Sequence, residues 1–119
     1  MPTTYTLPNG WYIDYQPSAT SSNDLALAAL RQSAGKAEGK CFQVGEQTKG
    51  RGRRGKKWVS KSGDGLYLSI ILCPETSRDT WSGLSFMASL AVYKALLGFI
   101  EDAHILRCSL KWPNDILYD

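Results

Sequence analysis

The segment with the clearest chemical potential is a basic, glycine-rich run that reads GRGRRGKK from Gly50 to Lys57. Glycines let backbone N–H groups approach a phosphate, and arginine pairs with two oxygens of a phosphate or carboxylate at once. The letters also fit the dinucleotide fingerprint and most of the P-loop pattern. Both of those need a helix directly after the glycines, whereas Trp58-Val59-Ser60 follows here. We therefore predict an anion-binding loop of another kind. Alone, it does not distinguish a mononucleotide from a nucleic acid or exclude a solvated surface loop.

The charge of the chain is concentrated in this segment. The 119 residues contain 14 Lys+Arg and 11 Asp+Glu, which gives a net charge of +3. Seven of the basic residues lie between Lys49 and Lys61 with no acid among them, so the remaining seven against 11 acids carry −4. This excludes a uniformly basic protein. It predicts a mildly acidic protein with one strongly basic loop.

A second motif, KWPND, runs from Lys111 to Asp115. Pro113 restrains Trp112 to an extended conformation, and Asn114 followed by Asp115 is typical of a turn. On their own, these residues fit an ordinary strand–turn–strand with Lys111 at the surface.

The two motifs together resemble those of the biotin protein ligase family, the biotin–acetyl-CoA-carboxylase ligases. GRGRRGKKWVS is followed about fifty residues later by KWPNDI, and the resemblance runs from Trp11 to Asp119. Lipoate ligases and octanoyl transferases share the family's fold but lack the arginine-glycine string. The resemblance implies an ATP-dependent reaction in two steps. Biotin and ATP give biotinyl-5′-AMP and pyrophosphate, and the biotinyl group then passes to a lysine of a biotin carboxyl carrier domain.

The resemblance also implies roles for individual residues. Lys111 and Arg53 are expected to be catalytic, with Lys111 stabilising the pentavalent phosphate. Residues expected to bind biotin or biotinyl-AMP are Ser21, Ser22, Asn23, Gln47, Gly50, Arg51, Arg53, Arg54, Trp58 and Lys111. The expected phosphate loop comprises Gly50, Arg51, Gly52, Arg53, Arg54, Gly55, Lys56 and Lys57. Asn114 and Asp115 are secondary candidates, and Mg²⁺ is expected to arrive with ATP rather than on protein ligands. Simpler interpretations stay open: the two serines suit helix capping, and Asn114 and Asp115 suit a turn.

The elements that must position these residues alternate without a regular βαβ pattern. Apolar runs predict strands at 11–15, 41–45, 66–73, 105–111 and 116–118. Capping residues at 21–24 predict a helix that ends by Gly35, and apolar residues at helical spacing predict an amphipathic helix over about 80–100. We therefore expect an α+β fold with a mixed, largely antiparallel sheet and packed helices. The resemblance implies a class II aminoacyl-tRNA synthetase/biotin ligase-like fold that is incomplete here.

The sequence and the family resemblance also lead to expectations about the domains of the chain, its cellular location and its partners. Residues 1–119 are expected to be the N-terminal portion of a catalytic domain, with no helix-turn-helix and no C-terminal β-barrel, so no DNA binding is expected. No apolar stretch approaches the ~20 residues that cross a bilayer, and three scattered cysteines with one histidine suit the cytoplasm. The family resemblance also allows a homodimer. The alternatives are an inactive fragment, a nucleic-acid-binding module that uses the basic loop, and lipoate ligase-type acyl transfer.

Overall fold

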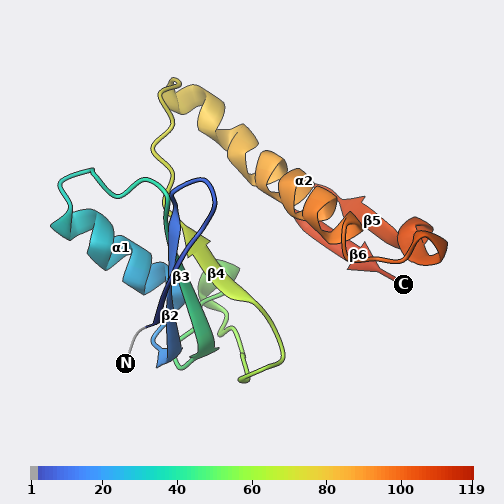
Figure 1. Cartoon of the computed structure of the whole chain (residues 1–119), viewed down its shortest axis with the longest axis horizontal. Coiled ribbons are helices and arrows are strands. Elements are labelled where there is room, and N and C mark those ends of the chain that lie inside the picture. Colours follow the sequence, from blue (N-terminus) through green and yellow to red (C-terminus); the bar gives the residue numbers. More distant parts are fainter. Residues whose placement is uncertain (1–2) are drawn as a thin grey trace. The chain divides into compact units, whose positions relative to one another are not determined.

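The computed structural model describes residues 3–119, apart from the side chains of Ala103 and Leu106. The chain forms two compact units, Met1–Pro74 and Glu75–Asp119. The elements, labelled in part in Figure 1, are β1 (Thr3–Thr6), β2 (Tyr12–Ala19), α1 (Ser22–Gln32), β3 (Lys40–Gln47), the 3₁₀ turn η1 (Arg53–Gly55), β4 (Tyr67–Ile70), η2 (Arg78–Gly83), α2 (Leu84–Leu97), η3 (Asp102–Arg107), β5 (Cys108–Lys111) and β6 (Asp115–Tyr118).

The first unit is a four-stranded sheet in the order β1-β2-β3-β4, with α1 to one side of it (Figure 1). The outer pairs, β1–β2 and β3–β4, are antiparallel, whereas β2 and β3 run parallel. Parallel neighbours need a crossover connection, and α1 supplies it. With the antiparallel β5–β6 pair, three of the four strand pairings are antiparallel. The prediction of a mixed, largely antiparallel α+β fold is therefore confirmed.

Helix α1 covers the buried face of this sheet. Its apolar side meets strand residues in a small core made of Ala26, Ala37, Phe42 and Ile71, with Leu25, Ala29 and Cys73 packed against it. Val44 and Cys41 are the largest fully buried side chains. The predicted helix end is close to the observed one, because Ala34 and Gly35 adopt left-handed φ values of 48° and 87° after the last turn.

The start of the first unit departs from the predicted strands. The sequence suggested a first strand over 11–15 that stops before Pro17, but β1 precedes it and β2 continues through Pro17 to Ala19. Next to this proline, strands β2 and β3 approach each other closely at Gly45. A Cβ at Gly45 would lie 2.7 Å from the Pro17 carbonyl oxygen. Strand β1, with the sequence TTYT, is exposed along its length, so it carries no apolar pattern to reveal it.

The second unit combines α2 with the β5–β6 hairpin, which pairs Lys111 with Asp115 across its tip. The helix predicted over 80–100 is confirmed as η2 followed by α2, but it is not amphipathic. Lys94 is its only charged residue, and large apolar side chains such as Met87 and Val92 are exposed. The strand predicted over 105–111 is wrong in its first part, because residues up to Arg107 form η3 and β5 begins at Cys108. Short apolar runs do not distinguish a helical turn from a strand.

No helix within residues 3–119 has both the length and the apolar character that crossing a bilayer requires.

Candidate functional site

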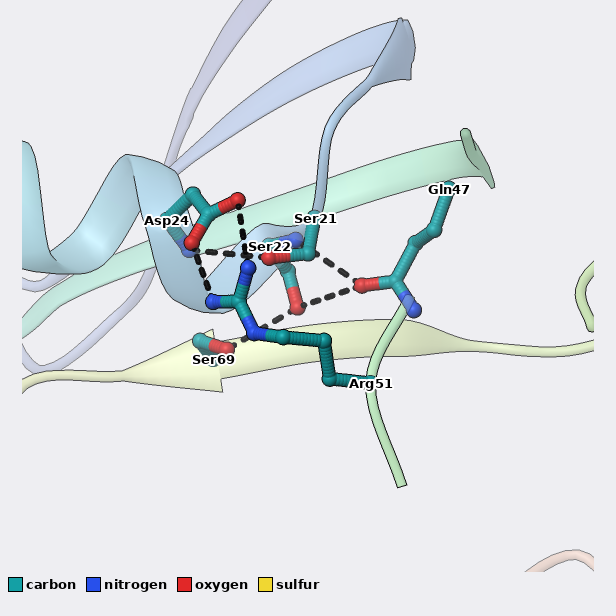
Figure 2. A network of polar contacts seen from close by, with 6 residues as sticks. All are labelled: Ser21, Ser22, Asp24, Gln47, Arg51 and Ser69. Carbon is teal, nitrogen blue, oxygen red and sulfur yellow. Dashed lines mark hydrogen bonds and ion pairs between the residues drawn. The ribbon is translucent and has the colours of Figure 1, made fainter. Parts of the chain in front are cut away.

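A polar cluster joins the beginning of α1, the end of β3 and the middle of β4 (Figure 2). The Ser22 backbone N–H donates to Gln47 Oε1 at 2.9 Å, and the Ser22 hydroxyl reaches the same oxygen at 3.3 Å. The Ser22 and Ser69 hydroxyls lie 2.9 Å apart. Ser22 is buried, and the cluster therefore holds hydroxyl and amide groups in fixed positions at one end of the sheet.

Ser21 caps α1, as the simpler interpretation of this residue predicted. Its backbone is extended, and its Oγ accepts a hydrogen bond from the Asp24 N–H at 3.0 Å. A serine in this position satisfies one of the four N–H groups that a helix start leaves without partners. Asn23, one position further than Ser22, is exposed. The three residues predicted at the helix entry thus differ in surroundings: a cap, a member of the buried cluster and a surface side chain.

The basic loop folds back on itself as a narrow hairpin. The Trp58 N–H donates to the Gly50 carbonyl at 2.9 Å, and the Gly52 N–H donates to the Lys56 carbonyl at 2.7 Å. The turn between them is η1, in which Arg54 and Gly55 take left-handed φ values of 57° and 74°. No P-loop or dinucleotide-fold helix follows the loop, in agreement with the rejection of both patterns from sequence.

The loop lines an open groove of about 820 Å³, which is bounded by Gly52, Arg53, Arg54, Lys56, Lys57 and Trp58. All the charged side chains of this lining are basic and exposed, and Trp58 is 56% exposed. Cations at this density repel one another unless an anion lies between them. The groove is therefore suited to phosphate or carboxylate groups, with an aromatic ring at its side for an apolar or planar ligand part.

Arg51 differs from the other cations of the loop because it has an acidic partner. Its guanidinium forms an ion pair with Asp24 in the first turn of α1 (Figure 2). The hydrogen bond from Arg51 is the main reason why the pKa of Asp24 falls from its ordinary value of 3.8 to about 2. Asp24 and Ser69 were not among the predicted site residues. In the sequence, Asp24 is one of the capping residues at 21–24, and nothing pairs it with a residue of the loop.

The second unit holds the remaining predicted residues on the β5–β6 hairpin. The Lys111 ammonium lies 3.5 Å from the Asp115 carboxylate, and both side chains are more than half exposed. The Trp112 ring packs against Phe86 of α2 with 5.3 Å between centroids, and Ser89 of α2 contacts the Pro113 carbonyl at 3.5 Å. The structure thus places Lys111, Trp112 and Asp115 at one hairpin tip, with the turn resting on α2. Asn114 is an exposed residue of the same turn.

No set of three His, Cys, Asp or Glu side chains suited to binding a metal occurs in the described part of the chain. Two carboxylates contact predicted phosphate-handling residues: Asp24 is paired with Arg51, and Asp115 is paired with Lys111. The donor set does not form a Mg²⁺ site of its own, so we treat the metal as part of the nucleotide substrate.

Comparisons with known proteins show which family the chain is similar to. Residues 15–119 match the model of the family described as biotin/lipoate A/B protein ligase. The bifunctional ligase/repressor BirA of Bacillus spizizenii is 33% identical over 108 residues, which are 91% of this chain and 31% of that protein. The biotin–[acetyl-CoA-carboxylase] ligase of Paracoccus denitrificans is 40% identical over 72 residues, 60% of this chain and 29% of that protein.

Solved structures give the same result. The biotin protein ligase of Leishmania major in complex with biotin superposes with a TM-score of 0.72 at 29% identity, covering 94% of this chain and 47% of that one. The biotin protein ligase of Aquifex aeolicus in complex with biotin and ATP gives 0.66 at 32% identity, covering 89% and 41%. The chain therefore spans about a third of these curated relatives and less than half of these solved structures.

Proposed function

The chain belongs to the biotin/lipoate A/B protein ligase family, and we propose that it contributes the biotin- and ATP-handling part of a biotin–[acetyl-CoA-carboxylase] ligase. The observation that carries the proposal is that one compact unit holds both the basic groove and the Ser22–Gln47–Ser69 cluster, and that the loop lining the groove follows Gln47 directly in the chain. A polar cluster for a neutral ring and a group of cations for a carboxylate and phosphates are what biotin and ATP require together.

In the first proposed step, a carboxylate oxygen of biotin attacks the α-phosphorus of ATP. A new P–O bond forms, the bond to the β-phosphate oxygen breaks, and the products are biotinyl-5′-AMP and pyrophosphate. Attack by an anion on a polyanion accumulates negative charge, so the protein must supply cations that are already in place. We assign this role to Arg53 and Arg54 with Lys56 and Lys57, whose side chains line the groove.

In the second proposed step, the uncharged amine of a carrier-domain lysine attacks the biotinyl carbonyl carbon. An amide bond forms, the bond between that carbon and the phosphate oxygen breaks, AMP leaves, and the amine loses a proton. The partner is then a biotin carboxyl carrier domain. The proposal places this chemistry in the cytoplasm, with no DNA binding by residues 1–119, and it allows a homodimer.

The remaining roles follow from the family resemblance. Ser21, Ser22, Asn23 and Gln47 would face the biotin ring system, Gly50 would allow close approach of the backbone, and Trp58 would stack toward adenine. Ser22 and Gln47 already share hydrogen bonds, which supports a joint role. Lys111 would stabilise the pentavalent phosphate, and Asn114 and Asp115 are secondary candidates for binding. Residues 1–119 would form the N-terminal portion of the catalytic domain.

The test is adenylate formation and binding by the 119-residue chain. The chain is incubated with biotin, Mg²⁺ and ATP labelled at the α-phosphate, and its affinity for biotinyl-5′-AMP is measured by calorimetry. We expect measurable adenylate binding with reduced formation of labelled product, because the chain is expected to be part of a longer catalytic domain, and a further loss of product of about a hundredfold in Arg53→Met. Lys61→Met, a basic residue outside the groove lining, is the matched control for loss of one positive charge. A folded chain that binds neither biotin nor its adenylate at millimolar concentration would refute the proposal.

A second candidate, nucleic-acid binding, is favoured by the exposed Trp58 ring beside the loop cations. It predicts affinity for single-stranded oligonucleotides that falls steeply with salt concentration. The labelled assay with lipoate in place of biotin separates the lipoate ligase alternative, because only the preferred acid gives adenylate efficiently.

A further inference from the structure

The ion pair between Asp24 and Arg51 connects two parts of the first unit that are 27 residues apart in sequence. Arg51 Nη1 donates to Asp24 Oδ2 at 3.4 Å, and Arg51 Nη2 donates to Asp24 Oδ1. The two side chains therefore meet in the two-pronged arrangement that arginine and a carboxylate prefer (Figure 2). The contact joins the first residue after Gly50 to the first turn of α1.

The helix holds Asp24 in place. Its N–H donates to the capping Ser21 Oγ, and its carboxylate lies in the first turn of α1, where the helix dipole favours negative charge. The side chain is 30% exposed, against 60% for that of Arg51. Because the pKa of Asp24 is about 2, the carboxylate is ionised at every pH near neutrality. The acceptor for Arg51 is thus permanent and fixed in direction.

On the loop side, Arg51 leaves the backbone at the base of the hairpin. Gly50 before it accepts from the Trp58 N–H, and Gly52 after it donates to the Lys56 carbonyl. Among residues 3–74, Asp24 and Arg51 form the only ion pair. Arg53, Arg54, Lys56 and Lys57 line the basic groove without an acidic partner, whereas the charge of Arg51 is already balanced.

We propose that Asp24 is a positioning residue, which holds Arg51 as a fixed connection between α1 and the base of the basic loop. Arg51 then orients the loop instead of binding the anionic ligand, and the phosphate-facing charge comes from Arg53, Arg54, Lys56 and Lys57. This assignment differs from the ligand-binding role that the family resemblance implies for Arg51. The ordering of the loop by the Asp24–Arg51 pair is inferred from the geometry alone. The effect of the pair on ligand affinity rests on the proposed function.

The test is a double-mutant cycle in the full 119-residue chain with Asp24→Asn, Arg51→Gln and the double variant. Asparagine keeps the size of Asp24 and its N–H bond to Ser21, so the helix start is preserved. Hydrogen exchange of the Gly52 and Trp58 amides reports loop order without ligand, and calorimetry reports the affinity for biotinyl-5′-AMP. Circular dichroism confirms that each variant is folded.

We expect each single variant to speed amide exchange and to weaken adenylate affinity by about two- to fivefold, as for an exposed ion pair. The double variant should resemble either single variant, because removing the second partner of a broken pair costs nothing further. Asp64→Asn, which removes an exposed charge elsewhere in the unit, should have no effect on either measurement.

Two results would overturn the inference. If Arg51 binds the ligand directly, Arg51→Gln weakens affinity far more than Asp24→Asn and still does so in the Asp24→Asn background. If amide exchange at Gly52 and Trp58 is unchanged in all three variants, the pair does not order the loop. A chain that binds no adenylate would refute the proposed function, while the exchange measurement would still decide the role of Asp24.

Discussion

Replacing Gly50 with alanine tests how tightly the base of the basic loop is packed. Gly50 is buried, and a Cβ at this position would lie 2.9 Å from the Trp58 carbonyl oxygen, 3.1 Å from Gln47 Nε2 and 3.2 Å from Trp58 Cβ. The Trp58 carbonyl is difficult to move, because the N–H of the same residue donates to Gly50. The extra methyl must therefore separate the two sides of the loop or displace the Gln47 side chain from Ser22.

Either response has a cost that can be stated. Forcing one methyl group into a packed site costs about 1–3 kcal/mol. Displacing Gln47 would lose its hydrogen bonds with Ser22, each worth about 0.5–1.5 kcal/mol. The structure relaxes along the cheaper route, so we expect Gly50→Ala to lower the free energy of unfolding by about 1–3 kcal/mol. It should also weaken adenylate binding, because both sides of the proposed site are displaced.

The assay is urea denaturation of the 119-residue chain followed by circular dichroism, with the slope of the transition compared between variants. Gly52→Ala is the matched control in the same loop. Its nearest contact would be the Lys56 carbonyl at 3.2 Å, and the surrounding loop residues are exposed and can move. Neither Gly50 nor Gly52 has a left-handed φ, so both changes test space alone. Gly50→Ala with an unchanged midpoint, or a loss no larger than that of Gly52→Ala, would refute this account of the loop base.

Three further outcomes are expected. Because the pKa of Asp24 is lowered from 3.8 to about 2, its contribution to stability is complete above about pH 4 and is lost as the pH falls toward 2. Acid unfolding of wild type and Asp24→Asn should therefore converge in that range. Ser22→Ala should destabilise by about 1 kcal/mol and by more than Ser69→Ala, because Ser22 Oγ contacts two partners and Ser69 Oγ one, as urea midpoints will show. Iodoacetamide should label Cys73 in the native chain but Cys41 only after unfolding, because Cys41 is 2% exposed and burial raises the pKa of its thiol; mass spectrometry distinguishes the two sites.

The sequence predicted those parts of the fold that depend on interactions between residues close together in the chain. The capping residues before α1 act through neighbours three positions away, so the helix start was visible in sequence. Pro17 was expected to end a strand for an equally local reason. That expectation failed because β2 pairs with β3 on both sides of Pro17, and the partners on β3 are distant in sequence. The parallel pairing of β2 with β3 likewise depends on a crossover and leaves no pattern in either strand alone.

The contrast between local and long-range interactions also explains which site residues could be predicted from the sequence. The basic loop was found from sequence because its charge and glycines are contiguous, and its groove follows from them. Asp24 was missed because its partner is 27 residues away and an acid in the first helical turn has a sufficient local explanation. Ser69 was missed because one serine in an apolar strand carries no spacing that links it to Ser22.

Two of the predicted cations, Arg51 and Lys111, each contact a carboxylate. The two contacts differ in how easily a phosphate could replace the carboxylate. Lys111 contacts Asp115 at 3.5 Å, four residues away on an exposed hairpin, and pairs of this kind contribute about 0–1 kcal/mol. A phosphate could replace that carboxylate at little cost, so the contact is compatible with the role proposed for Lys111. Arg51 would have to leave a two-pronged partner fixed by a helix cap and would release the base of the loop as it did so. We therefore propose opposite consequences of an acidic neighbour at the two sites: at Lys111 the carboxylate would exchange with ligand, and at Arg51 it would be part of the framework that presents the loop.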